Sequence, residues 1–302
     1  MNVIEVDGLT KRYGRHLALD GVSFSVGEGE IFGILGPNGA GKTTAVESIV
    51  GMREPDAGTI RVLGFDPLRQ RHEVRRLVGI QLQSSQQPDR MRVWEALNLY
   101  ASFYDQPADP EQLISDLGLA AKRDTPYRKL SGGQKQRVSI ALALVGNPRV
   151  AVLDELTTGL DPQARRETWQ LIEDTRNRGV TVILVTHLME EAERLCDRLA
   201  LIDAGHLVAI DTPAGIVAKT APDQRLSFRP SAPLDDARLL ALDEVTAVTR
   251  RGETIVVTGG GNVVHAVTAL LARAHTVAHD LRIEQATLDD AFIVLTGRRL
   301  DA

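Results

Sequence analysis

The chain has 302 residues, 43% of them hydrophobic and 25% charged, which is enough for one large domain and one small one. Its 35 basic and 40 acidic residues give a net charge of −5, so the charge balance does not indicate a nucleic-acid-binding surface. The longest apolar runs, such as residues 140–145, are far shorter than the roughly 18–20 residues that cross a bilayer, and the N-terminus lacks a signal-peptide pattern. We therefore expect any membrane pore to belong to another polypeptide. The single cysteine, Cys196, excludes an internal disulfide and fits a reducing cytoplasm.

Apolar segments near the N-terminus predict three strands. Residues 3–6 and 22–26 alternate as strands with one buried face do, whereas residues 30–35 form a run that indicates a buried strand. The sequence GPNGAGKTT follows at Gly36 to Thr44 and leads into a helix-compatible segment at 43–50. A strand, a glycine-rich segment of this pattern and a helix, in that order, are the context of a Walker A phosphate-binding loop.

The residues from Gly36 to Thr44 have the chemistry that a phosphate-binding loop needs. Glycines let the backbone turn with positive φ and bring N–H groups close to a phosphate, and the following helix N-terminus adds free amides and partial positive charge. Lys42 would reach the β- and γ-phosphates of ATP, Thr43 would hold Mg²⁺ through its hydroxyl, and Thr44 would add a hydrogen bond to a phosphate. We therefore expect ATP and Mg²⁺ to bind here, in contact with Gly36, Pro37, Asn38, Gly39, Ala40, Gly41, Lys42, Thr43 and Thr44.

A second motif, LSGGQ at Leu130 to Gln134, lies inside a segment at 84–148 that follows two further predicted strands at 59–63 and 77–82. Ser131 is a natural N-cap for the helix predicted by the apolar stretch that comes next. Gly132 and Gly133 leave that helix N-terminus uncovered, so its amides can face an anion.

Two later apolar runs end in candidate catalytic residues. Residues 150–153 lead into Asp154 and Glu155, and residues 180–186 lead into His187. Ligands of open α/β sheets bind at the carboxyl edge of the strands, so these side chains would gather there. Asp154 would orient Mg²⁺, Glu155 would take a proton from the water that attacks the γ-phosphate, and His187 would reach that phosphate. Acids or a histidine at a strand end are often ordinary surface residues, but a shared sheet favours the functional interpretation.

The rest of the chain predicts a helix at 168–178 that ends at Gly179, a hairpin that joins residues 199–202 and 207–210, and a linker at 219–224. The order of elements after the linker is β-α-β-β-α-β followed by a helix, which is typical of a small ferredoxin-like domain. The predicted ranges are strand 225–228, helix 235–242, strand 245–249, strand 254–258, helix 262–274, strand 277–283 and a closing helix from 287.

The two motifs and the Asp154–Glu155 pair together resemble the ATPase subunit of an ATP-binding cassette (ABC) transporter, over roughly residues 3 to 217. The resemblance implies an α/β fold, a P-loop NTPase cassette with three parts: a parallel-sheet ATP core, an antiparallel β subdomain, and a helical subdomain at about 84–148 that carries LSGGQ. We accordingly place the cassette at 1–220 and a small α+β C-terminal domain at 221–302.

The same resemblance implies roles for further residues. Tyr13 matches the aromatic residue that stacks on adenine, and Asp161 matches the loop that crosses the dimer interface. Gln83 matches the glutamine that links Mg²⁺ and the attacking water to the transmembrane partner, although Gln81, Gln86 and Gln87 lie close enough to leave that register open. The signature residues Ser131, Gly132, Gly133 and Gln134 would complete the ATP site of a second copy, head to tail.

Two features refine the resemblance. The family usually has proline after the catalytic glutamate, whereas this chain has Leu156; we expect catalysis to survive because Asp154 and Glu155 are in place. The C-terminal segment from Ala286 to Phe292, followed by residues 295–298, resembles the C-terminus of the daunorubicin-resistance type of drug-export ATPase. This second resemblance favours export.

Three functions compete for this sequence. The first is the ATPase that energises a membrane exporter of drugs or other hydrophobic compounds, with a second copy of itself and a separate multi-span permease as partners, at the cytoplasmic face of the membrane. The second is a soluble ABC-type ATPase that acts on nucleic acid or the ribosome, but relatives of that kind carry a long coiled coil or two cassettes. The third is a regulatory module without turnover, which an intact Glu155 argues against. The sequence favours the first and predicts no nucleic-acid partner.

Overall fold

The computed structural model describes residues 1–82, 87–220 and 223–297. Its internal contacts divide the chain after Pro213 into two compact units. The sequence placed this division after residue 220, but the helix α8 (Pro213–Thr220) belongs almost entirely to the second unit. In the described part of the chain no helix is long and apolar enough to cross a membrane.

The first unit combines two sheets. A three-stranded antiparallel sheet has the order β2-β1-β4, and a six-stranded sheet has the order β5-β6-β7-β3-β8-β9. Within the larger sheet every neighbouring pair is parallel except β8 and β9. The strands are β1 (Asn2–Tyr13), β2 (His16–Gly27), β3 (Ile31–Leu35), β4 (Ala57–Val62), β5 (Val78–Gln81), β6 (Val150–Asp154), β7 (Thr181–Thr186), β8 (Arg198–Asp203) and β9 (His206–Asp211).

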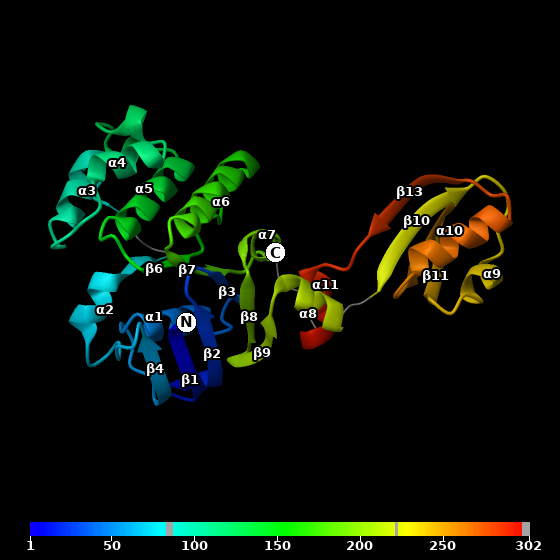
Figure 1. The fold of residues 1–302 in the computed structure, drawn as a ribbon, viewed down its shortest axis with the longest axis horizontal. Coiled ribbons are helices and arrows are strands. Elements are labelled where there is room, and N and C mark those ends of the chain that lie inside the picture. Colours follow the sequence, from blue (N-terminus) through cyan, green and yellow to red (C-terminus); the bar gives the residue numbers. More distant parts are fainter. Residues whose placement is uncertain (83–86, 221–222, 298–302) are drawn as a thin grey trace. The chain divides into compact units, whose positions relative to one another are not determined.

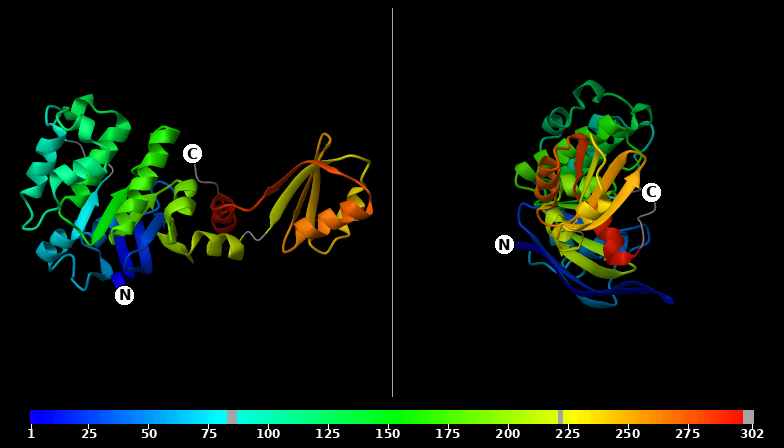
Figure 2. Two further views of the ribbon diagram at one scale, coloured as in Figure 1. Left: turned by 45° about the horizontal axis from the view of Figure 1, so that its top comes forward. Right: turned by 90° about the vertical axis from the view of Figure 1, so that its right-hand side faces the viewer.

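The first unit contains seven described α-helices. Helices α3, α4 and α5 gather into a separate group, the predicted helical subdomain (Figures 1 and 2). The helices of the first unit are α1 (Lys42–Ile49), α2 (Arg71–Leu77), α3 (Val93–Ala101), α4 (Pro110–Asp116), α5 (Gly132–Leu144), α6 (Pro162–Asn177) and α7 (Met189–Leu195), with short 3₁₀ turns η1 (Ala120–Lys122) and η2 (Tyr127–Lys129).

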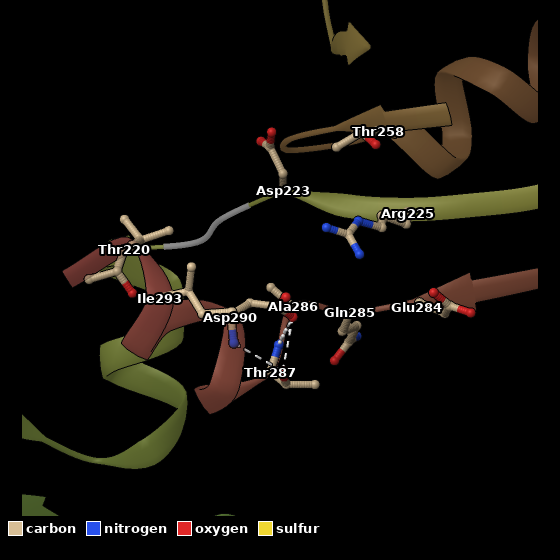
Figure 3. Close-up of a pocket in the computed structure, with 11 residues that line it drawn as sticks. Thr220, Asp223, Arg225, Thr258, Glu284, Gln285, Ala286, Thr287, Asp290 and Ile293 are labelled. Carbon is tan, nitrogen blue, oxygen red and sulfur yellow. Dashed lines mark hydrogen bonds between the residues drawn. The ribbon is translucent and has the colours of Figure 1, made fainter. Parts of the chain in front are cut away.

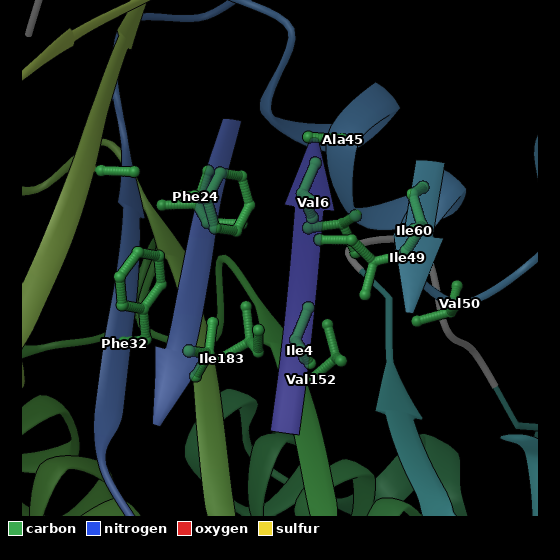
Figure 4. Close-up of a cluster of buried hydrophobic side chains, with 14 of the residues drawn as sticks. Ile4, Val6, Phe24, Phe32, Ala45, Ile49, Val50, Ile60, Val152 and Ile183 are labelled. Atoms are coloured by element: carbon green, nitrogen blue, oxygen red, sulfur yellow. The ribbon is translucent and has the colours of Figure 1, made fainter. Parts of the chain in front are cut away.

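The main core of the first unit lies between the two sheets and against α1 (Figure 4). Ile4 of β1 and Phe24 of β2 enter it from the antiparallel sheet, and Phe32 of β3 enters it from the parallel sheet. The rings of Phe24 and Phe32 stack with centroids 5.4 Å apart. Stacked aromatic pairs stabilise a fold by more than the burial of their apolar surface alone. Ile49 anchors α1 to the same cluster, so the segment that precedes α1 is held against the main core of this unit.

The second unit contains a four-stranded antiparallel sheet of order β11-β12-β10-β13. This is the strand order of the split βαβ arrangement, so the predicted ferredoxin-like fold is confirmed. Burial alternates along β12, and α9 and α10 cover one face of the sheet (Figures 1 and 2) around Phe228 and Val257. The elements are β10 (Gln224–Pro230), α9 (Asp236–Leu240), β11 (Val245–Arg251), β12 (Thr254–Gly259), α10 (Val263–Arg273), β13 (Ala278–Glu284) and α11 (Leu288–Thr296).

Candidate nucleotide site

The segment from Gly36 to Thr44 connects the end of β3 to the start of α1, and its glycines are required by geometry. Gly36, Gly39 and Gly41 have φ angles of 157°, 80° and 105°, which side chains rarely allow. A Cβ atom at Gly36 would lie 2.0 Å from the carbonyl oxygen of Ile202, and one at Gly41 would lie 2.4 Å from that of Ala18. The loop therefore packs its backbone directly against β8 and β2, and only glycine fits at these two positions.

The side chain of Lys42, the first residue of α1, folds back into the glycine-rich loop. Its side chain is 5% exposed, and Nζ donates to the carbonyl oxygens of Gly36 and Pro37 at 2.8 and 3.1 Å. Burial lowers the pKa of the ammonium group, an effect that the carboxylates of Glu155 and Asp154 oppose. The result is a fixed positive charge at the centre of a backbone loop, which suits a phosphate chain.

Asp154 is the last residue of β6, next to β7, which in turn pairs with β3. The carboxyl ends of these three strands are therefore neighbours, and they deliver Asp154, His187 and the glycine-rich loop to one edge of the sheet. The carboxylate of Asp154 is almost fully buried. Desolvation, and secondly the charge of Glu155, raises its pKa to about 6, although Lys42 acts in the opposite direction. A buried carboxylate of this kind favours a partner that supplies positive charge.

Glu155 adopts a left-handed backbone conformation with φ of 50°, which non-glycine residues seldom do. Its N–H donates to the carbonyl oxygen of Val185 at 2.9 Å, which fixes the turn after β6. Its Oε1 atom lies 3.1 Å from Nδ1 of His187 and 3.9 Å from Nζ of Lys42. The strained backbone thus directs the carboxylate between the loop lysine and the histidine.

A pocket of about 460 Å³ opens beside this cluster. Its lining combines residues of the β1–β2 hairpin, part of the glycine-rich segment and the acid after β6: Tyr13, His16, Ala18, Asn38, Gly39, Gly41, Lys42, Thr43, Thr44 and Glu155. Tyr13 is 40% exposed, and the guanidinium of Arg53 lies 5.1 Å from its ring centroid. An exposed aromatic face next to a phosphate-type loop offers both a stacking surface for a base and charge partners for phosphates.

The signature residues form a different pocket, of about 290 Å³. Ser131 caps α5, since its hydroxyl accepts the N–H of Gln134 while the Gln134 side chain accepts the N–H of Ser131. Asp161 lines the same pocket and caps α6 by accepting the N–H groups of Gln163 and Ala164. Most of the predicted site residues line one of these two pockets. The signature pocket is lined by Ser131, Gly132, Gly133, Gln134 and Asp161, and the other by Tyr13, Asn38, Gly39, Gly41, Lys42, Thr43, Thr44 and Glu155. Gly36, Pro37, Ala40, Asp154 and His187 are not among the lining residues of either pocket.

Comparison with known proteins agrees with this geometry. The family model for ABC transporters matches residues 19–158. The Nod factor export ATP-binding protein I of Paraburkholderia xenovorans is 39% identical over 98% of both chains. This chain belongs to the ABC transporter family. A second relative, the daunorubicin resistance ATP-binding protein DrrA3 of Streptomyces coeruleorubidus, is 36% identical over 97% of this cassette protein and 96% of that chain.

The structural comparison supports the same family. The dimeric structure of a bacterial ABC transporter cassette is 26% identical, with a TM-score of 0.62, and covers 69% of this chain and 98% of that one. The resemblance predicted from the motifs is thus confirmed, and the cassette protein is an ATPase of the exporter type that binds nucleotide.

The structure describes two of the four glutamines that left one register open, Gln81 and Gln87. Gln83 and Gln86 lie outside the described residues. Gln81 is buried at the end of β5, and its Oε1 accepts the N–H of Asp154 at 3.0 Å, so it supports the strand end that carries the carboxylate. Gln87 donates to the hydroxyl of Tyr100 at 3.3 Å. No local pattern predicts the contact between Gln81 and Asp154, because these two residues are 73 positions apart in the chain.

A larger pocket, of about 930 Å³, lies in the second unit (Figure 3). Its charged lining residues are mixed, with Asp223 and Glu284 near Arg225. Asp290 accepts the N–H and the hydroxyl proton of Thr287 as part of a helix cap. None of the residues predicted to bind nucleotide lines this pocket, so we assign the nucleotide to the smaller pocket beside Lys42.

Proposed function

We propose that this cassette protein hydrolyses Mg²⁺-ATP as one half of a head-to-tail homodimer. The observation that carries the proposal is the separation of the two pockets, one lined by the Walker A loop and one by the signature, within a single chain. The signature pocket presents the capped N-terminus of α5 without the lysine or carboxylates of the first pocket. A second copy would bring each signature pocket to the other copy's phosphates, where a helix N-terminus is favourable.

The roles of the residues follow from their positions. Glu155 is the general base, since its carboxylate lies between Lys42 and His187 at the mouth of the loop, where it can accept a proton from an attacking water. Lys42 and the backbone N–H groups of the loop bind the β- and γ-phosphates. His187 fixes the Glu155 carboxylate through the 3.1 Å contact and approaches the terminal phosphate.

Mg²⁺ fits the oxygen ligands that the site offers. The hydroxyl of Thr43 and the carboxylate of Asp154 are hard ligands of the type that Mg²⁺ prefers, and the buried Asp154 charge is stabilised by a cation. When bound, Mg²⁺ would supply positive charge against the charge that develops on the phosphates during hydrolysis. Gln83, predicted as a further ligand, lies outside the described residues.

The names of the relatives support a transport role. Their names describe Nod factor export and daunorubicin resistance, so we propose that hydrolysis energises export of a drug or other hydrophobic compound through a separate multi-span permease. The cassette protein would then act at the cytoplasmic face of the membrane, bound to that permease. Co-purification with a multi-span membrane protein tests this assignment, and co-purification with ribosomes or nucleic acid instead would contradict it.

A mixing experiment tests the shared sites directly. Lys42→Ala disables the Walker A pocket and Ser131→Arg blocks the signature pocket, so each homodimer has two defective sites. A mixed dimer would contain one site with both partners intact, so mixing equal amounts of the two inactive variants should restore ATPase activity. If mixing restores nothing although the two variants co-purify through separate tags, the head-to-tail arrangement is wrong.

The catalytic assignment has its own test. Glu155→Gln should lower kcat by about 10²–10⁴-fold while ATP still binds, and size-exclusion chromatography should detect an ATP-dependent dimer. Glu190→Gln is the matched control, because Glu190 is 74% exposed on α7 and should leave kcat unchanged. Full activity in Glu155→Gln would rule out Glu155 as the base.

A further inference from the structure

Glu191 of α7 is a buried acid that the mechanism above does not use. Its side chain is completely buried. Its Oε1 atom accepts the hydroxyl proton of Thr157 at 2.7 Å and the indole N–H of Trp169 at 3.0 Å. Its Oε2 atom has no hydrogen-bond partner among the residues that the structure describes. No lysine or arginine pairs with it in any ion pair of the described regions.

A buried acid in these surroundings is unfavourable for stability alone. Two neutral donors on one oxygen do not replace the water that a carboxylate loses on burial. Well-packed apolar residues of similar volume are often neutral or stabilising at such positions. A role other than stability is therefore needed to explain an acid here.

The three residues in this contact come from segments that carry site residues. Thr157 lies two positions after Glu155, in the turn that follows β6. Glu191 lies in the first turn of α7, four positions after His187. Trp169 belongs to α6, whose N-cap is Asp161. One carboxylate oxygen of α7 thus contacts both the turn after Glu155 and α6, the helix that Asp161 caps.

The turn after Glu155 needs such a support. Glu155 has the left-handed backbone described above, and Leu156 after it is fully buried. Conformations of this kind persist only where the surrounding structure holds them. The N–H of Glu155 is fixed on Val185 of β7, and the Thr157 hydroxyl is the next side-chain contact along the turn.

We propose that Glu191 is a positioning residue for catalysis. It holds the turn after β6 against α7, so that the carboxylate of Glu155 and the imidazole of His187 keep their 3.1 Å separation. The inference rests on the proposed role of Glu155 as the base. A displacement of about 1 Å at a reacting group can reduce a rate about 10²-fold, so loss of the Thr157–Glu191 contact should lower kcat much more than it changes the KM for ATP.

The decisive variant is Glu191→Leu, because it removes the acceptor while filling the space with an apolar group. We expect kcat to fall at least tenfold and the KM for ATP to change less than twofold. The thermal midpoint should fall modestly, because Thr157 and Trp169 lose their buried acceptor, and it serves to confirm that the variant is folded. Glu191→Gln retains the acceptor oxygen and should keep kcat within about threefold of the parent chain. Glu190→Leu, at the exposed neighbouring position, should leave both kcat and KM unchanged.

A second pair keeps the test informative if Glu191→Leu does not fold. Thr157→Val removes the donor to Glu191, whereas Thr157→Ser retains it, so only the valine variant should show the selective loss of kcat. Unchanged kcat in a folded Glu191→Leu or Thr157→Val protein would overturn the proposal, as would equal losses in the valine and serine variants. Glu155→Gln, measured in parallel, tests the role of Glu155 separately from the role of Glu191. If Glu155→Gln stays active, the proposed base is wrong. If Glu155→Gln is inactive and Glu191→Leu is fully active, only the inference about Glu191 fails.

Discussion

Asp154→Asn should stabilise the nucleotide-free protein while abolishing its function. The folded pKa of Asp154 is raised to about 6 from the ordinary 3.8, chiefly because burial removes the carboxylate from water. The folded chain therefore holds this proton more tightly than the unfolded chain does, and the contribution to stability is lost as pH rises from 3.8 through 6. Above pH 6 the ionised carboxylate costs about 3 kcal/mol of folding free energy.

Asparagine removes that charge with little change in shape. In nucleotide-free buffer with EDTA at pH 8, we expect Asp154→Asn to gain up to about 3 kcal/mol, or about 6–12 °C in thermal midpoint for a domain of this size. At pH 4.5 the gain should fall to about 1 kcal/mol, because the folded parent chain is then protonated. Scanning calorimetry at both pH values measures the difference, and the same variant should lose Mg²⁺-dependent ATPase activity.

Asp89→Asn is the control, because Asp89 is exposed and the substitution should leave the midpoint unchanged at both pH values. A midpoint for Asp154→Asn that is no higher than that of the parent chain at pH 8 would refute the reasoning. So would a gain of the same size at pH 4.5, because the effect would then not come from ionisation of this carboxylate.

Three further predictions concern the loop, the signature helix and the second unit. Gly36→Ala should abolish ATP binding in a fluorescent-nucleotide assay, because its Cβ would lie 2.0 Å from the carbonyl oxygen of Ile202, whereas Gly39→Ala, with open space around its Cβ, should cost only the left-handed backbone penalty of about 1–2 kcal/mol. Ser131→Ala should lower stability in urea by about 1 kcal/mol through loss of the α5 cap. Phe228→Ala should lower the unfolding transition of the second unit by about 3–5 kcal/mol, and a single unchanged calorimetric transition would contradict this.

The sequence predicted those parts of the fold in which the local pattern of apolar residues corresponds to the burial of those residues in the structure. The continuous apolar runs of β6 and β7 are buried on both faces in the structure, as parallel strands require. The strand predicted at 254–258 is β12, in which Ile255 and Val257 face the core. The predicted helix at 168–178 began too late, because α6 starts at Pro162 after the Asp161 cap. A proline at the first helical position was the signal that would have extended it.

What the sequence could not provide arises from contacts between distant segments. The antiparallel strands β1 and β2 extend well beyond the predicted residues 3–6 and 22–26, because backbone pairing with a neighbour continues where the apolar alternation stops. The support of Asp154 by Gln81 joins two strands of the sheet. Glu191 lies beside Glu190 in a helix of charged residues, and nothing in that pattern distinguishes the buried acid from the exposed one.

Three acids near the carboxyl ends of β6 and β7 each lower the stability of the first unit. Asp154 is a desolvated carboxylate, Glu155 has a strained backbone, and Glu191 is a buried acid whose Oε2 atom has no hydrogen-bond partner among the described residues. Such departures from the rules of folding concentrate at functional sites, and the rest of the protein must offset them. The core between the sheets, which holds α1 (Figure 4), is the part of this unit that can do so. Asp154→Asn should therefore raise stability and reduce turnover together, whereas gains in stability without loss of turnover must come from residues outside this cluster.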